Sequence, residues 1–176
     1  ACAKGALLHR QGRPLCMAVN LFSAQFKLGG LARMVADTLR ETGLPGEGLE
    51  IEITERVIIN SDNRLKNTLN DLRSLGCQLA FDDFGTGYAS LSMLKEFPIT
   101  RLKVDKSFVD AIHESGEDHA VVQAMIQLAE TFGFSITAEG IETEQQAEVL
   151  RQLGCREGQG YLFGKPMPWQ ELYALL

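Results

Sequence analysis

Short β-rich runs alternate with amphipathic helical segments along almost the whole of this 176-residue chain. The residue types that favour strands are concentrated at 15–20, 49–54, 78–83, 101–105, 134–139 and 158–163. Apolar residues recur at helical spacing between them, at 28–42, 61–75, 117–132 and 143–153. Parallel strands need connections of a dozen or more residues, and the helical segments provide them. The alternation therefore predicts an α/β fold built on parallel strands.

The ends of these helices carry recognisable signals. Ser61 is a candidate N-cap, and Gly76 follows the end of the same helix. Gly133 follows the third helix, and Thr143 with Gln146 forms a capping-box pattern at the start of the fourth. Local chemistry therefore predicts where the helices begin and end.

Two parallel architectures fit this pattern: an open doubly wound sheet and a closed (β/α)8 barrel. The open sheet normally has a glycine-rich phosphate turn after its first strand, and no such turn follows Asn20. A complete barrel has eight strands in about 250 residues. We therefore expect a TIM-like barrel in which residues 1–176 form one domain and about two N-terminal strand units are missing. A start without methionine, inside a helical pattern, is consistent with truncation at the N-terminus.

Charge and cysteine usage limit the possible partners. Seventeen basic and 23 acidic residues give a net charge of −6, whereas a binder of nucleic-acid polymers needs a basic surface. No apolar run approaches the roughly 20 residues of a membrane span, so we expect no membrane contact by this domain, although a longer parent protein could be tethered. The four cysteines form no CxxC pair, which favours a cytoplasmic setting. Cys16 and Cys77 are expected to be buried, inert thiols.

Polar side chains interrupt these otherwise apolar strands near their carboxyl ends. Parallel strands are normally covered on both faces, where an unpaired charge is costly. Active sites of parallel α/β folds lie at the carboxyl ends of the strands, so we expect these groups to meet in one pocket. They are Asn20, Glu52, Asp82, Asp83, Lys103, Asp105, Glu139 and Gln159.

The oxygen-rich composition of this set predicts a metal site. Carboxylate and amide oxygens, without thiolate or imidazole, suit Mg²⁺ or Mn²⁺ better than zinc. One of two adjacent aspartates, here Asp82 and Asp83, can bridge two ions about 4 Å apart while its neighbour binds only one. Two metal ions and a bound water hydrolyse phosphodiesters, so the pattern favours an anionic phosphodiester substrate.

Single residues admit other roles. Lys103 could simply pair with a carboxylate, and a Schiff-base enzyme would need its amine neutral, which nearby carboxylates oppose. The tripeptide at 83–85, DFG, matches the metal-binding motif of kinases, but no HRD loop or glycine-rich phosphate loop accompanies it. The repetition of polar groups at several strand ends favours the metal site.

Six motifs follow one another along the chain: NLFSAQF, EITER, DDFGTGYASL, RLKVDKSFV, AEGIETEQQ and GCREGQGYLFGKP. Together they resemble the EAL-domain family of bacterial cyclic di-GMP phosphodiesterases, and the resemblance covers nearly the whole chain. It implies a modified TIM barrel that uses Mg²⁺ or Mn²⁺ to hydrolyse cyclic di-GMP to linear pGpG, which ends second-messenger signalling.

The same resemblance implies roles for individual residues. Glu139 corresponds to the general base for the attacking water, and Lys103 corresponds to a residue that positions water and phosphate. The metal ligands that it implies are Asn20, Glu52, Asp82 and Asp83. The remaining candidates, at the substrate or its loop, are Glu55, Asp105, Glu142 and Gln159.

The segment FGTGYAS, residues 84–90, resembles the mobile loop beside the family's second metal, and Glu55 resembles the residue that anchors it. This loop and the helix after it also resemble the family's dimerisation surface. We therefore expect a homodimer formed through the segment that follows Asp83. Contacts with the partner could then order the metal site.

Two departures from the family pattern bear on activity. The Glu-Ala-Leu segment, whose glutamate supplies a further metal ligand, is not among these residues, so we expect hydrolysis by the complete domain and leave the activity of this stretch open. Phe22 and Ala24 replace a serine and an arginine, which affects the grip on substrate near Asn20. The alternative function is a degenerate EAL module that binds cyclic di-GMP or a protein partner without turnover.

Overall fold

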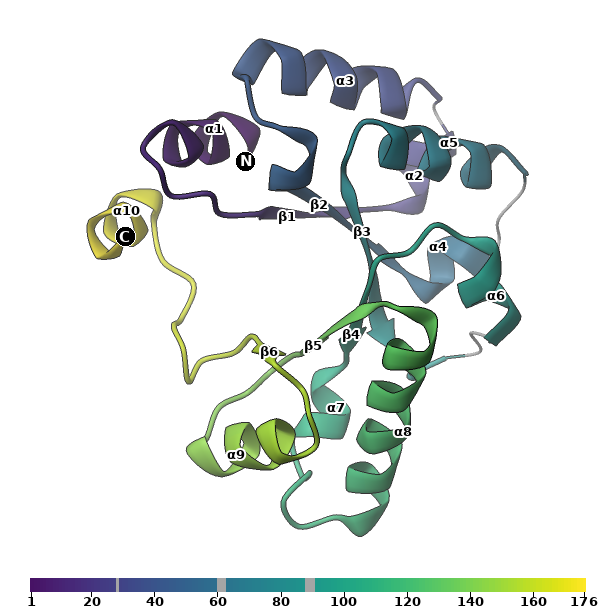
Figure 1. Ribbon diagram of the computed structural model, residues 1–176, viewed down its shortest axis with the longest axis vertical. Helices are drawn as coiled ribbons and strands as arrows, with labels where there is room; N and C mark the ends of the chain where they lie inside the picture. Colours follow the sequence, from purple (N-terminus) through teal and green to yellow (C-terminus); the bar gives the residue numbers. More distant parts are fainter. Residues whose placement is uncertain (28, 60–62, 88–90) are drawn as a thin grey trace.

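The computed structural model describes residues 1–27, 29–59, 63–87 and 91–176. Within these residues, six strands form one parallel sheet in the order β1-β2-β3-β4-β5-β6 (Figure 1). Each strand pairs with the next one in the sequence, as in a (β/α) barrel, but β1 and β6 do not close the sheet. The strands are β1 (Met17–Leu21), β2 (Leu49–Thr54), β3 (Gln78–Phe84), β4 (Arg101–Val104), β5 (Ser135–Ala138) and β6 (Glu157–Gly158).

Helices surround the strands (Figure 1). Helix α4 packs on β2 and β3, α5 packs on β3, and α8 packs on β4 and β5. Helices of the described ranges lack the length and apolar character that a membrane span requires. They are α1 (Cys2–Arg10), α2 (Ser23–Lys27), α3 (Leu31–Thr42), α4 (Glu55–Ile59), α5 (Asn63–Ser74), α6 (Leu91–Glu96), α7 (Lys106–Val109), α8 (Gly116–Phe132), α9 (Glu144–Gln152) and α10 (Trp169–Leu175).

The first and last helices lie side by side (Figure 1). Gln11, just after α1, donates a hydrogen bond to the hydroxyl of Tyr173 at 2.7 Å. The ammonium of Lys4 lies 4.8 Å from the ring centroid of Trp169, which is within cation–π range. Contacts outside the sheet therefore bring the two ends of the chain together.

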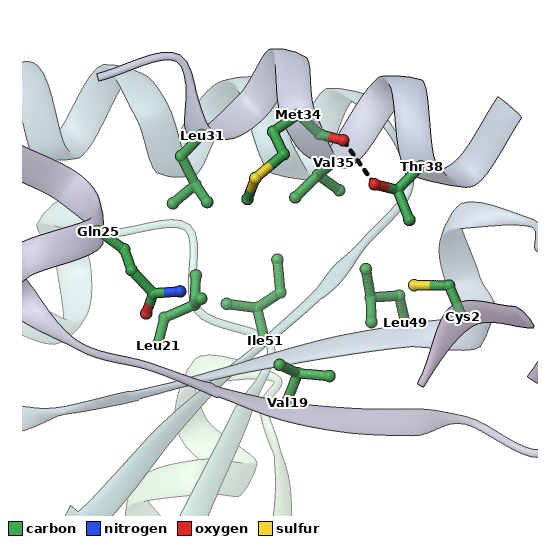
Figure 2. Close-up of a pocket in the computed structure, with 10 residues that line it drawn as sticks. All are labelled: Cys2, Val19, Leu21, Gln25, Leu31, Met34, Val35, Thr38, Leu49 and Ile51. Carbon is green, nitrogen blue, oxygen red and sulfur yellow. Dashed lines mark hydrogen bonds between the residues drawn. The ribbon is translucent and has the colours of Figure 1, made fainter. Parts of the chain in front are cut away.

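Figure 2 shows how α3 packs on the outer face of the first two strands. Apolar side chains surround a cavity of about 180 Å³ there, with Val19 and Leu21 from β1, Leu49 and Ile51 from β2, and Leu31 and Val35 from α3. Successive side chains of a strand point to opposite faces. The side chains at the alternate positions of these strands therefore point away from α3, to the opposite face of the sheet. Among them are Asn20, Glu50 and Glu52.

The predicted helix ends agree with the structure at several positions. Thr143 and Gln146 form both hydrogen bonds of a capping box at the start of α9. Gly133 ends α8 in the left-handed conformation, with φ of 73°. Helix α3 begins at Leu31, later than predicted; residue 28 and the expected N-cap Ser61 lie outside the described residues.

The last strand is much shorter than predicted, because the chain turns around Ile141 after Gly158. Ile141 donates its amide to the carbonyl of Gln159 and accepts from the amide of Leu162, both at 3.0 Å. A Cβ atom on Gly160 would lie only 2.1 Å from the carbonyl oxygen of Ile141. The close approach of the two backbones replaces the predicted strand at 158–163 with a turn.

The two expected buried thiols differ in environment. Cys77 is buried, as predicted. Cys16 is exposed, so that prediction was wrong. The reason is its position just before β1, which is an edge strand of the described sheet.

Candidate metal centre

Lys103 of β4 is the centre of a buried ionic cluster. Its Nζ lies 2.6 Å from Glu52 Oε1, 2.7 Å from Glu139 Oε1 and 3.1 Å from Asp82 Oδ1. These side chains are between 5% and 18% exposed. They come from β2, β3, β4 and the residue after β5, so the structure brings four of the predicted site residues together at the carboxyl ends of the strands.

Burial and charge act in opposite directions on this cluster. Burial alone would lower the pKa of Lys103, but the carboxylates of Glu139 and Glu52 outweigh it and raise that pKa above its ordinary value. Lys103 is therefore a cation, which argues against Schiff-base chemistry. Burial raises the pKa of Glu139, although Lys103 opposes this. A glutamate with a raised pKa is a better proton acceptor near neutral pH than an ordinary one.

A group of three carboxylates overlaps this cluster. Ligand oxygens of Asp82, Asp83 and Glu139 all lie within 4.8 Å of one another. The Oδ1 atom of Asp82 is buried and accepts no hydrogen bond from the described residues, although Lys103 Nζ lies at ion-pair distance. A buried acceptor without a donor is costly, and a bound cation would satisfy it.

An irregularity in β3 explains how two consecutive aspartates approach one site. Side chains of neighbouring residues in a regular strand point to opposite faces. The pairing of β3 with β4 shifts register between Phe81 and Phe84, and Asp83 has a left-handed backbone with φ of 55°. The pKa of Asp83 is raised by burial and by the nearby carboxyls of Asp82 and Asp105. The bulge therefore concentrates negative charge that a divalent cation would neutralise.

These residues fit ions of the Mg²⁺ and Mn²⁺ type. The donors are carboxylate oxygens, which hard cations prefer, and one of them lacks a hydrogen-bond donor. Asp82, Asp83 and Glu139 are close enough to share ions, and Glu52 joins them through Lys103.

Asn20 and Gln159 belong to the two edges of the sheet, on either side of the cluster. Asn20 lies beside Glu52 in the register of β1 and β2 and is exposed. Gln159 follows β6, and its amide donates to the carbonyl of Ala138 at 2.8 Å, next to Glu139. Their assigned roles at metal and substrate stay predictions.

Glu55 lies at the start of α4 and is 4% exposed. Its Oε1 accepts no hydrogen bond from the described residues, and burial raises its pKa. A Cβ atom on Gly87 would lie 2.0 Å from Glu55 Oε2, so the predicted loop packs directly on this carboxyl group at Gly87. Residues 88–90 of that loop lie outside the described residues.

Asp105 lies at the edge of the cluster, and Glu142 lies away from it. Asp105 caps α7, where its Oδ1 accepts from the amide of Ser107 at 3.0 Å and from its hydroxyl at 2.5 Å. These bonds outweigh burial and lower the pKa of Asp105, which also hydrogen-bonds with Asp83. Glu142 Oε1 lies 2.5 Å from Lys106 Nζ on the surface, and its role at the substrate stays a prediction.

The sequence-based prediction missed a second ionic network on the same strands. Arg101 Nε donates to Glu50 Oε2 at 2.7 Å, and Arg101 Nη1 donates to Thr137 Oγ1 at 2.7 Å and to the carboxylate of Glu157. The signal was present, because Arg101 precedes Lys103 by two residues and Glu50 precedes Glu52 by two. Which side chains would meet depends on the stagger of the strands, which alternation alone does not give.

Known proteins share this architecture. A family model described as EAL domain matches residues 1–166. The phosphodiesterase PaMucR, solved as a cyclic di-GMP complex, matches with a TM-score of 0.92 and 38% identity, over 98% of this chain and 70% of that one. Klebsiella pneumoniae BlrP1, solved with manganese and cyclic di-GMP, matches with a TM-score of 0.85 and 33% identity, over 94% of this chain and 42% of that one. These matches confirm the predicted α/β, TIM-like fold.

The chain is shorter than its curated relatives. The signaling protein YkoW of Bacillus subtilis is 38% identical over 168 residues, which are 96% of this chain and 21% of YkoW. An uncharacterized Synechocystis protein, sll1895, is 46% identical over 160 residues, which are 91% of this chain and 23% of that protein. The chain therefore spans less than a quarter of either relative.

Proposed function

Because this chain belongs to the EAL domain family, we propose that its domain is a metal-dependent phosphodiesterase that hydrolyses cyclic di-GMP to linear pGpG. The observation that carries the proposal is the convergence of Glu52, Asp82, Lys103 and Glu139 at the carboxyl ends of the strands. The cyclic di-GMP found with PaMucR and BlrP1 supports the choice of substrate.

Two Mg²⁺ or Mn²⁺ ions are the proposed cofactors. Asn20, Glu52, Asp82 and Asp83 would hold them, and the buried Asp82 Oδ1 atom, which accepts no hydrogen bond from the described residues, supports this assignment. Such ions lower the pKa of a bound water and offset the charge of a phosphodiester. The manganese in BlrP1 supports the type of metal.

Glu139 and Lys103 divide the remaining chemistry between them. Glu139 would accept the proton of the attacking water, and its raised pKa suits this role. Lys103 would donate one hydrogen bond, from the N–H that Glu52 and Glu139 leave free, to the phosphate oxygen on which negative charge develops, because these carboxylates fix its ammonium in place. Gln159 and Asp105 would line the substrate site.

Charge makes the order of binding predictable. The chain carries a net charge of −6, and the cluster contains more carboxylates than ammonium groups. An anionic dinucleotide would be repelled by such a site unless cations are present. Binding of cyclic di-GMP is therefore expected to require the metal.

The domain is further proposed to work as a cytoplasmic homodimer without contacts to membranes or nucleic-acid polymers. The segment after Asp83 would form the dimer surface, and the packing of Gly87 on Glu55 provides a path from that segment to β2. Replacing Glu55 by alanine should then change metal affinity as well as turnover.

Product analysis by HPLC tests the function directly. The 176-residue chain and a longer version that continues on its N-terminal side would be incubated with cyclic di-GMP and Mg²⁺, Mn²⁺ or EDTA. We expect pGpG from the longer version with metal, none with EDTA, and at least about a hundredfold less from Glu139→Gln. Glu148→Gln, which changes an exposed carboxylate paired with Arg151, is the matched control. Tight binding of cyclic di-GMP without product would instead identify a binding module.

A further inference from the structure

A second polar network lies beneath the metal centre, on the same face of the sheet. We call it the lower network, and its members are Glu50, Arg101, Thr137 and Glu157. Arg101 is its centre, as Lys103 is the centre of the cluster above. The residues Glu50 and Thr137 are buried, and the Arg101 side chain is 20% exposed.

Each member of the lower network lies on a strand and precedes by two positions a candidate site residue on that strand or just after its end. Glu50 precedes Glu52, and Arg101 precedes Lys103. Thr137 and Glu157 stand in the same relation to Glu139 and Gln159. A strand rises about 3.3 Å per residue, so the two sets of side chains are separated by about 7 Å along each strand.

Arg101 connects strands that do not pair with each other. Its own strand, β4, pairs with β3 and β5, whereas Glu50 lies on β2 and Glu157 lies on β6. The hydrogen bonds of the Arg101 guanidinium therefore reach across one face of the sheet, past β3 to β2 and past β5 to β6. Backbone pairing alone fixes each strand only against its neighbours.

The composition of the lower network indicates a role beyond stability. Removing charged groups from water is costly, and a buried ion pair often contributes little net stability compared with apolar side chains. Such pairs are better suited to fixing one arrangement of the surrounding chain. The planar guanidinium of Arg101, with donors in fixed directions, is well suited to hold several partners at set distances.

We propose that Arg101 is a positioning residue for the metal centre, which sets the relative positions of β2, β4, β5 and β6 so that Glu52, Lys103 and Glu139 meet. The inference rests on the proposed function, because it concerns the same metal site. Groups that hydrogen-bond directly to metal ligands commonly change metal affinity by roughly ten- to a hundredfold when they are replaced, whereas Arg101 bonds residues that lie one strand repeat below the proposed ligands. Arg101 would act on these ligands through the backbone of four strands.

Manganese binding without substrate is the measurement that tests this role. Free Mn²⁺ would be followed by electron paramagnetic resonance as it is titrated into metal-free protein, well below the melting temperature of each variant. Arg101→Met removes every hydrogen bond that the Arg101 side chain makes and keeps a side chain of similar length. Arg101→Lys retains the positive charge. Thr137→Val removes one hydroxyl at nearly constant shape, so it remains informative if Arg101→Met does not fold. Arg151→Met, which breaks an exposed pair with Glu148, is the control.

The expected loss of Mn²⁺ affinity differs from one variant to the next. Arg101→Met should weaken Mn²⁺ binding by roughly tenfold or more, and Thr137→Val by about threefold. Arg101→Lys should recover part of the loss, and Arg151→Met should match the wild type. Unchanged Mn²⁺ affinity in the folded Arg101 and Thr137 variants, even with lower melting temperatures, would give the network a purely structural role and overturn the inference. If the longer version used in the HPLC test binds no Mn²⁺ either, the proposed function fails, and this inference fails with it.

Discussion

Lys103 Nζ lies 2.7 Å from Glu139 Oε1. This ion pair links β4 to the residue that follows β5. The same ammonium also contacts Glu52 and Asp82, so one cation holds three carboxylates. Any divalent ion bound by these carboxylates would share their charge with Lys103. Lys103 and a bound metal ion should therefore both stabilise the fold by neutralising the same carboxylates.

Lys103→Met should lower the free energy of unfolding in metal-free buffer by about 3 to 5 kcal/mol, because it leaves buried carboxylates without their partner. Saturating Mn²⁺ should stabilise this variant more than the wild type, because the ions no longer compete with the ammonium. Urea denaturation with EDTA and with Mn²⁺ measures both effects. Lys106→Met removes an exposed lysine that pairs with Glu142 and should change stability little. Equal stabilisation by Mn²⁺ in Lys103→Met and wild type would show that the carboxylates do not hold the ion.

Glu55 predicts a pH-dependent loss of stability. Burial raises its pKa in the folded state above the unfolded value of about 4.3, so the folded protein binds more protons between those two values. The stability of the wild type should therefore fall as pH rises through this window. Glu55→Gln removes this loss and should be more stable than wild type at pH 7, with no gain below pH 4.

Denaturation curves between pH 4 and pH 8 would measure the difference for Glu55→Gln. Glu130→Gln, on the exposed side of α8, is the matched control and should show no such trend. A gain that is the same at every pH would mean that charge at position 55 is not its cause.

Gly87→Ala should disturb the contact between the predicted loop and Glu55. The added methyl group would lie 2.0 Å from Glu55 Oε2, so the buried carboxyl group must move. We expect the free energy of unfolding to fall by about 1 to 3 kcal/mol, together with weaker Mn²⁺ binding. Gly116→Ala, where the new methyl group meets open space, should lower neither quantity. Loss of stability with normal Mn²⁺ affinity would separate the loop contact from the metal site.

The sequence predicted local features of the fold better than contacts between distant strands. The capping box of Thr143 and Gln146 depends on residues three apart, and it was predicted correctly. Alternation placed Lys103 on the polar face, since that needs only the period of a strand. The partners of Arg101 were missed because they come from β2, β5 and β6, whose relative heights depend on the stagger of the whole sheet. The predicted strand at 158–163 failed for a similar reason, because its end is set by contact with Ile141.

Asp83 should show opposite effects on stability and on metal binding. Its pKa is raised by burial and by the carboxyls of Asp82 and Asp105, so the charged form is disfavoured in the folded protein. Asparagine tolerates the left-handed backbone at this position, and its amide can still donate to Asp105. Asp83→Asn should therefore raise stability in metal-free buffer at pH 7, and the gain should vanish below about pH 3.9.

The same Asp83→Asn variant should bind Mn²⁺ more weakly, because a neutral amide replaces a charged ligand next to Asp82. Urea denaturation with EDTA and Mn²⁺ titration, each beside Asp71→Asn on the exposed face of α5, measure the two effects. Wild-type Mn²⁺ affinity in Asp83→Asn would remove Asp83 from the ligand set. Lower stability without metal would mean that its carboxylate makes favourable contacts that outweigh the repulsion. Both expected results together would mean that the bulge in β3 holds charge for a cation at the expense of the metal-free fold.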